Sequence, residues 1–528
     1  MLLIFVAIVS SYSSCKKENV GASDIVSKNT DNKNISEMIV LGQKLEDPYE
    51  FDNMRMAFDI LCKQGIQFPF TSISPTGNYV RVLIHSDEEL ESIEVDSALI
   101  WFDYPLNYEI VKGGSFYVDS TLKDASVSWQ YGVIPCGYTL PSGLVVEYLY
   151  EVFIPEDQKD YDKYEEYYDM IEDLSESICD KEFKKEISTQ SKKSKWTPSA
   201  HITVWDDLKE TYVPLEGVRV NARRGCKTRY AITDQNGNCT FDSKFKKKVD
   251  YSIEWRRHYW RIVTTEKNKK TYLTGPNKEG KWTKTILKRD GEDYMRATIH
   301  RAALIANYKS LWTVSRPHKT NSIGFHTKLK IRYNHANNGS RIGIAQPGSS
   351  TDLKGADVVI WGKDDCGELY LTQHIFSNTL HELAHCAHSY WYKKKGNGGF
   401  SSVNQFIAES WASCVQWKVT TDYYVGCFNN RGYNGGLQDW TPELASTYYG
   451  VYTPVFIDLI DDFNQHNFYG EAPTDNINGY TLVEIQDNIL GESRDLSTLT
   501  IALKNNKLHN TTDDQITYLL QKYQNLAF

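Results

Sequence analysis

The spacing of hydrophobic and polar residues changes along the chain, and each change indicates a different kind of element. Residues 52–63 repeat apolar positions at the spacing of an amphipathic helix, and residues 78–84 and 97–104 alternate as half-buried strands do. We therefore expect an N-terminal α+β domain over residues 45–155. The acidic stretch that follows, residues 156–196, has the pattern of a solvated helical linker.

Residues 197–289 alternate apolar and polar side chains at period two, which predicts a β-rich middle domain. Thr233, Asp234, Gly237 and Phe241 form the pattern T-D-x-x-G-x-x-x-F. This pattern resembles the carboxypeptidase regulatory-like domain, a small β-sandwich. The resemblance implies that the aspartate and glycine close a hairpin, that the aromatic side chain enters the core, and that the domain is a spacer or adhesion module.

The remaining chain, residues 290–528, combines helical and strand patterns. A helix is expected over residues 292–308, and apolar runs at residues 328–335, 340–348 and 355–362 predict strands. Two more helices flank a Gly-rich loop, and the rest is mostly helical. The fold class expected for the whole chain is therefore multidomain, with an α+β domain at each end and a β-sandwich between them.

The N-terminus, MLLIFVAIVSSYSSC, carries an apolar run that is too short to span a bilayer, which is typical of a signal peptide over residues 1–15. The small residues before Cys15 resemble the lipobox of Bacteroidetes lipoproteins. The resemblance implies lipid on Cys15 and attachment to the outer membrane at the cell surface, or alternatively at its periplasmic face. Residues 16–42 are polar and predict a disordered tether.

Composition narrows the class of protein. The chain has 528 residues, 41% of them hydrophobic, which is enough for more than one packed core. Its net charge of -9 argues against a nucleic-acid partner, which usually requires a basic surface. Ten cysteines are present, and export permits disulfides. We expect Cys226 and Cys239 to pair, because they bracket one predicted hairpin.

The stretch TLHELAHCAHSYW contains the candidate metal ligands and catalytic base. His381 and His385 are four residues apart, so both imidazoles leave the same face of a helix and can reach one zinc ion. Glu382 follows the first histidine and is placed to take a proton from water that the metal activates. The H-E-x-x-H pattern therefore predicts a catalytic Zn²⁺ site.

A catalytic zinc needs a third protein ligand. His388 shares the helix face, but it lies seven residues from His381, about 10 Å along a straight helix, and one ion cannot bond to both ends of that span. Glu409 lies 24 residues after His385, on the face of the next helix opposite its apolar stripe. We expect Glu409 to be the third ligand and His388 to line the cleft or support the ligands.

His381, His385 and Glu409 resemble the ligand set of the gluzincin peptidases, and the sequence AESWA around Glu409 resembles their third-ligand helix. The resemblance implies a zincin-like peptidase domain over residues 290–528 with Glu382 as the general base. Two positions depart from the related patterns. Ser413 stands where an acidic residue often follows the third ligand, and Ala384 stands where the enhancin-like family prefers glycine.

The resemblance also implies a donor that stabilises the oxyanion and a strand that pairs with the substrate. The strand is expected at residues 356–362. The donor is expected downstream of the third ligand, and the sequence leaves four candidates open, Tyr448, Tyr449, Tyr452 and His466.

The leading interpretation is a lipid-anchored zinc endopeptidase that acts on extracellular proteins or glycoproteins. The first alternative is a noncatalytic adhesion or binding lipoprotein, which would have no use for the base Glu382. The second is an enhancin-like mucin-type glycoprotein peptidase, which shares the metal chemistry and differs in its cleft.

Overall fold

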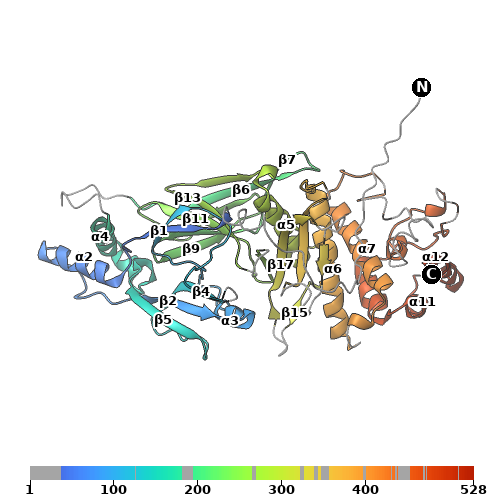
Figure 1. Cartoon of the computed structure of the whole chain (residues 1–528), viewed down its shortest axis with the longest axis horizontal. Helices are drawn as coiled ribbons and strands as arrows, with labels where there is room; N and C mark the ends of the chain where they lie inside the picture. Colours follow the sequence, from blue (N-terminus) through green and yellow to red (C-terminus); the bar gives the residue numbers. More distant parts are fainter. Residues whose placement is uncertain are drawn as a thin grey trace, which may run out of the picture.

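The computed structural model describes residues 37–124, 127–180, 194–264, 269–320, 326–337, 343–345, 356–364, 366–396, 400–429, 431–433, 437, 452–467, 470, 472–508 and 510–527. The chain forms an elongated molecule of mixed helices and sheets, with the N-terminal elements at one end and the C-terminal helices at the other (Figure 1). Cys15 and most of the expected tether lie outside the described residues. The last tether residues belong to the fold, because Ile39 is 2% exposed and a strand begins at Val40.

The N-terminal elements combine a three-stranded sheet, a two-stranded sheet and three helices. The central strand β2 pairs antiparallel with β4 and β5, and β1 pairs with β3. The elements are β1 (Val40–Lys44), α2 (Phe51–Lys63), β2 (Gly77–Ile84), α3 (Asp87–Ile93), β3 (Tyr108–Lys112), β4 (Ser128–Pro135), β5 (Val145–Val152) and α4 (Tyr161–Cys179).

The acidic segment forms α4, which differs from the expected solvated linker. Its inner face is buried against α2 in a core that contains Tyr168 and Ile171. Glu172 on that face is 0% exposed, accepts a hydrogen bond from Tyr49 at 2.7 Å and pairs with Lys227 at 3.3 Å. Acidic composition alone predicted a solvated helix, but acidic residues on the inner face of α4 have buried partners.

The middle of the chain folds into two four-stranded sheets. One sheet contains β6, β7, β10 and β14, the other has the order β13-β11-β8-β9, and both contribute to one buried core. The strands are β6 (Ser199–Asp206), β7 (Thr211–Pro214), β8 (Arg219–Arg224), β9 (Lys227–Ile232), β10 (Asn238–Thr240), β11 (Val249–Glu254), β13 (Tyr272–Lys278) and β14 (Trp282–Ile286).

The T-D-x-x-G turn links these two sheets. The Asp234 carboxylate accepts the backbone N–H of Asn238 at 2.9 Å, Gly237 takes a positive φ of 73°, and Phe241 is 2% exposed. The turn joins β9 to β10, which belong to different sheets, so it is a corner and not a hairpin. Cys226 lies in the turn between β8 and β9, Cys239 lies in β10 of the other sheet, and both are free thiols, so the expected disulfide is absent.

A third four-stranded sheet supports the helix that carries the H-E-x-x-H motif. Its order is β12-β17-β19-β18, with β12, β17 and β19 parallel and β18 antiparallel at the edge. Its strands are β12 (Trp260–Val263), β17 (Leu329–Asn337), β18 (Gly343–Ala345) and β19 (Val358–Lys363), and a separate short ribbon pairs β15 (Lys319–Thr320) with β16 (His326–Thr327). Because β12 comes from the expected middle domain, this sheet crosses the expected boundary at residue 289.

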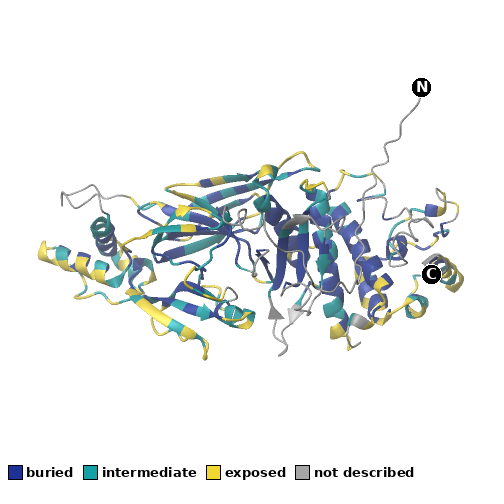
Figure 2. Ribbon diagram, viewed as in Figure 1, coloured by how far each residue is buried: buried dark blue, intermediate teal, exposed yellow. Residues whose placement is uncertain are grey.

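Helices cover this sheet and continue toward the C-terminus. Figure 1 shows α5 and α6 beside the sheet, with α7 next to α6 and the last helices beyond, and Figure 2 shows that burial is concentrated in the sheet, α6 and α7. The helices are α5 (Glu292–Tyr308), α6 (Thr372–Lys394), α7 (Gln405–Tyr423), α9 (Val455–Asp458), α10 (Leu482–Glu484), α11 (Leu496–Asn505) and α12 (Asp513–Ala527). Among the described residues, no helix has both the length and the apolar character needed to span a bilayer.

The middle sheets hold the start of α6 in place. The Asp207 carboxylate, which follows β6, accepts hydrogen bonds from the backbone N–H and the hydroxyl of Thr372 at 2.9 and 3.1 Å. It also accepts a hydrogen bond from Tyr294 of α5 at 2.5 Å. A carboxylate at a helix N-terminus satisfies an unpaired N–H group and favours the helix dipole. The position of α6 therefore depends on residues from three separate parts of the chain.

Candidate metal centre

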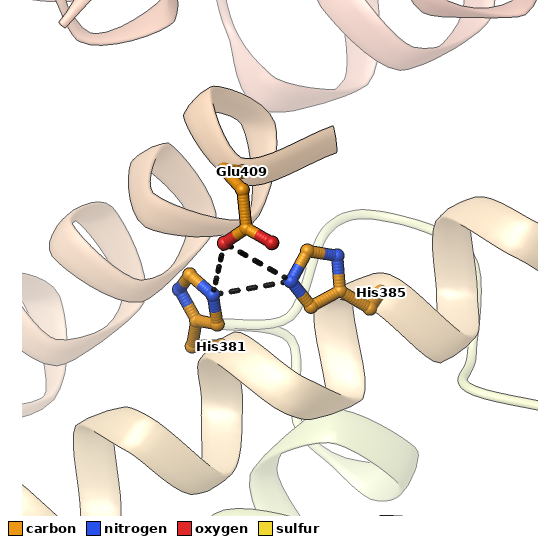
Figure 3. Close-up of side chains that lie close together, drawn as sticks. All are labelled: His381, His385 and Glu409. Carbon is orange, nitrogen blue, oxygen red and sulfur yellow. Dashed lines mark hydrogen bonds and ion pairs between the residues drawn. The ribbon is translucent and has the colours of Figure 1, made fainter. Parts of the chain in front are cut away.

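Two adjacent helices bring three possible metal ligands together. His381 and His385 project from α6, Glu409 projects from α7, and the three side chains point toward one another (Figure 3). Their side chains are 12%, 7% and 10% exposed. The structure thus places all three sequence-predicted ligands at one point, close to the surface but largely shielded from water.

The separations among the ligand atoms are close to those around a small tetrahedral ion. His385 Nε2 lies 3.1 Å from His381 Nε2, and Glu409 Oε2 lies 3.2 Å from His381 Nε2 and 3.6 Å from His385 Nε2. Ligands that bond to one zinc ion at about 2.0–2.2 Å in tetrahedral directions lie about 3.3–3.6 Å apart. The group could therefore hold a metal ion and leave a fourth position open.

A glutamine fixes which nitrogen of His381 faces the centre. Nδ1 of His381 lies 3.2 Å from Oε1 of Gln416, an oxygen that can only accept, so Nδ1 carries the proton. Nε2 then presents a lone pair toward Glu409 and His385. Because lone pairs converge on the same point, a cation between them would be stabilised, and this orientation is the one that metal-binding histidines usually require.

Further hydrogen bonds hold Gln416 in place. Its amide nitrogen donates to Oγ of Ser377 at 3.3 Å, and Ser377 donates to the hydroxyl of Tyr433 at 2.6 Å. Ser377 lies one helical turn before His381 on α6. The hydrogen-bond chain therefore connects both helices behind the ligand.

The electrostatics of Glu409 favour its ionised form. Burial opposes ionisation, but the electrostatic influence of the neighbouring His385 and His381 outweighs it and holds the pKa of Glu409 well below its ordinary value. A carboxylate that is ionised throughout the neutral range is the form that binds a metal.

Glu382 is buried beside the edge strand of the sheet. It is 3% exposed, and a Cβ atom added to Gly343 of β18 would lie 2.6 Å from its Oε1. Only glycine permits β18 to approach the Glu382 side chain this closely. The strand thus sets the position of the predicted base.

His388 is not part of the ligand group. It is 1% exposed, its ring lies 4.9 Å from that of Phe400, and neither ring nitrogen has a hydrogen-bond partner among the described residues. Burial lowers the pKa of His388 to about 3, with a smaller contribution from His385, so the ring is neutral. His388 packs beside the centre as an aromatic side chain.

The two described candidates for the oxyanion donor hydrogen-bond to backbone carbonyls. The hydroxyl of Tyr452 donates to the carbonyl of Leu437 at 2.5 Å, and Nδ1 of His466 hydrogen-bonds to the carbonyl of Ala472 at 2.9 Å. Neither is in the metal-ligand group, and Tyr448 and Tyr449 lie outside the described residues. Most of the segment 356–362 lies in β19, between β17 and β18, so the strand expected to pair with substrate is internal and β18 forms the edge.

The sequence assigned no role to two residues that this geometry uses. Gln416 lies seven residues after Glu409, a spacing that places both on one face of a helix, so periodicity offered a signal. Gly343 lies far from the motif in sequence, and no local pattern indicated that it approaches Glu382.

Comparison with protein-family models, curated proteins and solved structures finds no match for this chain.

Proposed function

We propose that the protein is a zinc-dependent endopeptidase that hydrolyses peptide bonds in extracellular proteins or glycoproteins. The observation that carries this proposal is the triangle of His381, His385 and Glu409, whose ligand atoms lie 3.1–3.6 Å apart. The helix that supplies the two histidines also carries Glu382 of the H-E-x-x-H motif. Two imidazoles and one carboxylate with an open fourth position are typical of catalytic zinc sites, whereas structural zinc sites are closed.

Residues of the chain have separate roles in the proposed reaction. When bound, a zinc ion activates water and polarises the peptide carbonyl. Glu382 takes the proton from the attacking water and delivers it to the leaving amine, which is the role of a general base and acid. Gln416 keeps the imidazole of His381 in its ligating tautomer. Burial of the ligands strengthens these interactions by limiting contact with bulk water.

The edge strand β18 offers a place for the substrate backbone. It pairs antiparallel with β19 on one side, and within the described residues no strand pairs with its other side. Gly343 of β18 touches Glu382, so a peptide that extends the sheet at this edge passes beside the base. Addition of an extended peptide to an exposed edge is a common mode of peptide recognition.

The N-terminal sequence supports a location for this activity. A signal peptide over residues 1–15 and lipid on Cys15 would anchor the protein to the outer membrane, where the cell surface gives access to protein and glycoprotein substrates. A noncatalytic binding lipoprotein is less well supported, because a binding role needs neither Glu382 nor an open metal position.

Hydrolysis of casein and of mucin by the zinc-loaded chain tests the proposal. Glu382→Gln should retain zinc and lose at least about a hundredfold in rate, the scale on which general bases contribute. The matched control is Glu368→Gln, which changes an exposed glutamate that precedes the same helix. Equal rates in the parent chain and Glu382→Gln would refute the assigned mechanism.

A further inference from the structure

A large cleft lies between the N-terminal elements and the middle sheets. Its volume is about 1180 Å³, which exceeds that of most small-molecule sites, at about 300–1,000 Å³. Three of the elements that line it, β4, α4 and β9, lie toward the N-terminal end of the molecule, away from α6 and α7 (Figure 1). The cleft is therefore separate from the zinc-ligand group.

One wall of the cleft is the free edge of β9. This strand is the last in the order β13-β11-β8-β9, and residues 228–232 line the cleft. The backbone N–H of Thr233 donates to the carbonyl of Val218 at 3.0 Å, and hydrogen-bonded pairs alternate with unbonded pairs along an antiparallel ladder. The N–H and C=O groups of Tyr230 and Ile232 therefore point away from β8, and no other described segment hydrogen-bonds to them.

Two buried hydroxyl groups in the lining also lack partners. Thr228 is 9% exposed and Ser243 is 8% exposed, and both residues line the cleft. Neither hydroxyl has a hydrogen-bond partner among the described residues. Native structures pair nearly all such groups, because an unpaired buried donor or acceptor costs free energy. This wall therefore indicates a ligand that supplies hydrogen bonds.

The walls of the cleft are acidic. Four carboxylates line it without an ion-pair partner among the described residues, those of Asp96, Asp162, Glu165 and Asp242. Asp157 is neutralised by Arg229 at 2.7 Å, and Glu156 is neutralised by Lys227 at 2.6 Å. Lys244 is the remaining cation of the lining. The unpaired charge is therefore negative, which favours a cationic ligand over nucleic acid or anionic lipid.

We propose that the cleft binds an extended polypeptide rich in lysine or arginine, which adds to the edge of β9. Main-chain hydrogen bonds to Tyr230 and Ile232 hold its backbone, in the manner of β-strand addition. The unpaired carboxylates of the cleft attract its cationic side chains. An oligosaccharide could also use carboxylates and hydroxyls, but it would leave the strand edge unpaired. The proposal does not depend on the zinc centre.

Anisotropy of labelled peptides mixed with the full-length, zinc-loaded chain tests the proposal. The probe is a peptide of about ten residues that alternates lysine and threonine, a length that exceeds the edge of β9. One comparison peptide replaces lysine by glutamate, and another carries a methyl group on every backbone nitrogen. We expect one lysine peptide per chain, no binding of the glutamate peptide, and at least about tenfold weaker binding of the methylated peptide, which keeps its charge and loses its backbone donors.

Two neighbouring glutamates of α4 give matched variants. Glu165 lines the cleft and Glu166 does not, and both are exposed. Glu165→Gln should weaken binding of the lysine peptide about 1.5- to 5-fold, the scale of an exposed ion pair, and Glu166→Gln should leave it unchanged. Glu382→Gln should bind the peptide as the parent chain does, which excludes cleavage of the probe as the source of the signal.

Three results would overturn the proposal. The first is no binding of the lysine peptide at millimolar concentration. The second is equal affinity for the lysine peptide and its methylated form, since the edge of β9 would then play no part. The third is binding of a neutral chitin oligosaccharide in place of the lysine peptide, which would assign the cleft to a glycan.

Discussion

Replacing Gln416 by methionine isolates the hydrogen bond that orients His381. Methionine has a similar length and fits a buried position, and Gln416 is 4% exposed. It cannot accept the proton on Nδ1 of His381, which lies 3.2 Å from the glutamine oxygen. The change therefore leaves the three ligand side chains intact and removes the constraint on the imidazole tautomer.

The size of the effect follows from two considerations. Loss of an outer partner of a ligating histidine typically lowers metal affinity about 10- to 100-fold, which is about 1.4–2.7 kcal/mol. A buried N–H left without an acceptor costs about 1–3 kcal/mol, and the His381 side chain is 12% exposed. Both give the same range, so we expect a 10- to 100-fold rise in the zinc dissociation constant, measured by competition with a chelating dye.

Gln416→Glu is the control. It keeps an acceptor oxygen at the same position and loses the donor to Ser377, so its zinc affinity should equal or exceed that of the parent chain. If Gln416→Met binds zinc as tightly as the parent, Gln416 does not orient His381. If Gln416→Glu is weakened as much as Gln416→Met, the contact with Ser377 matters more than the acceptor.

Three other substitutions have defined outcomes. Gly343→Ala should keep zinc but slow hydrolysis about 10- to 100-fold, because the added Cβ would lie 2.7 Å from Cγ of Glu382 and push the base by almost 1 Å. His388→Leu should keep zinc and melt at or above the parent temperature, since the histidine is buried without a described partner; loss of zinc would show that it is a ligand. Glu94→Gln removes one carboxylate from the buried Arg256 and Lys270, which keep Glu254, and from the partly buried Lys328; it should lower the free energy of unfolding in urea by about 3–5 kcal/mol, whereas the exposed Glu88→Gln should have little effect. Burial opposes ionisation, but the neighbouring arginine and lysines hold the pKa of Glu94 well below 4.5, so the difference between the Glu94 variant and the parent should persist above about pH 4.5 and shrink as the pH falls through that lower pKa.

Elements with a strong local pattern were predictable from the sequence. The helix expected over residues 292–308 occupies Glu292–Tyr308, with acidic residues in its first turn. The alternation at residues 97–104 predicted a strand, but this segment forms only an isolated bridge through Phe102. Trp101 there donates its indole N–H to the carbonyl of Ile93, so its burial serves packing and not a sheet.

Pairing between distant strands was not predictable. β12 and β17 form a parallel pair that begins at Trp260 and Leu329, and nothing in either strand's own pattern indicates the other. The expected boundary at residue 289 missed this connection. One continuous hydrophobic core extends from the middle sheets into the C-terminal helices for the same reason.

In the candidate site too, features set by local sequence patterns were predictable and contacts between distant segments were not. The spacing of His381 and His385 follows from helix geometry alone, and the periodicity of the second helix indicated Glu409. The approach of Gly343 to Glu382 depends on how β18 joins the sheet. Such contacts are tertiary, so they required the structure.

X-ray absorption at the zinc edge identifies the ligands of the bound metal. We expect one zinc per chain, four-coordinate, with two imidazole nitrogens and the remaining ligands oxygen, and loss of that signature in Glu409→Ala. A zinc-free protein, a sulfur ligand, or an unchanged spectrum in Glu409→Ala would contradict the assignment of His381, His385 and Glu409 as the metal centre.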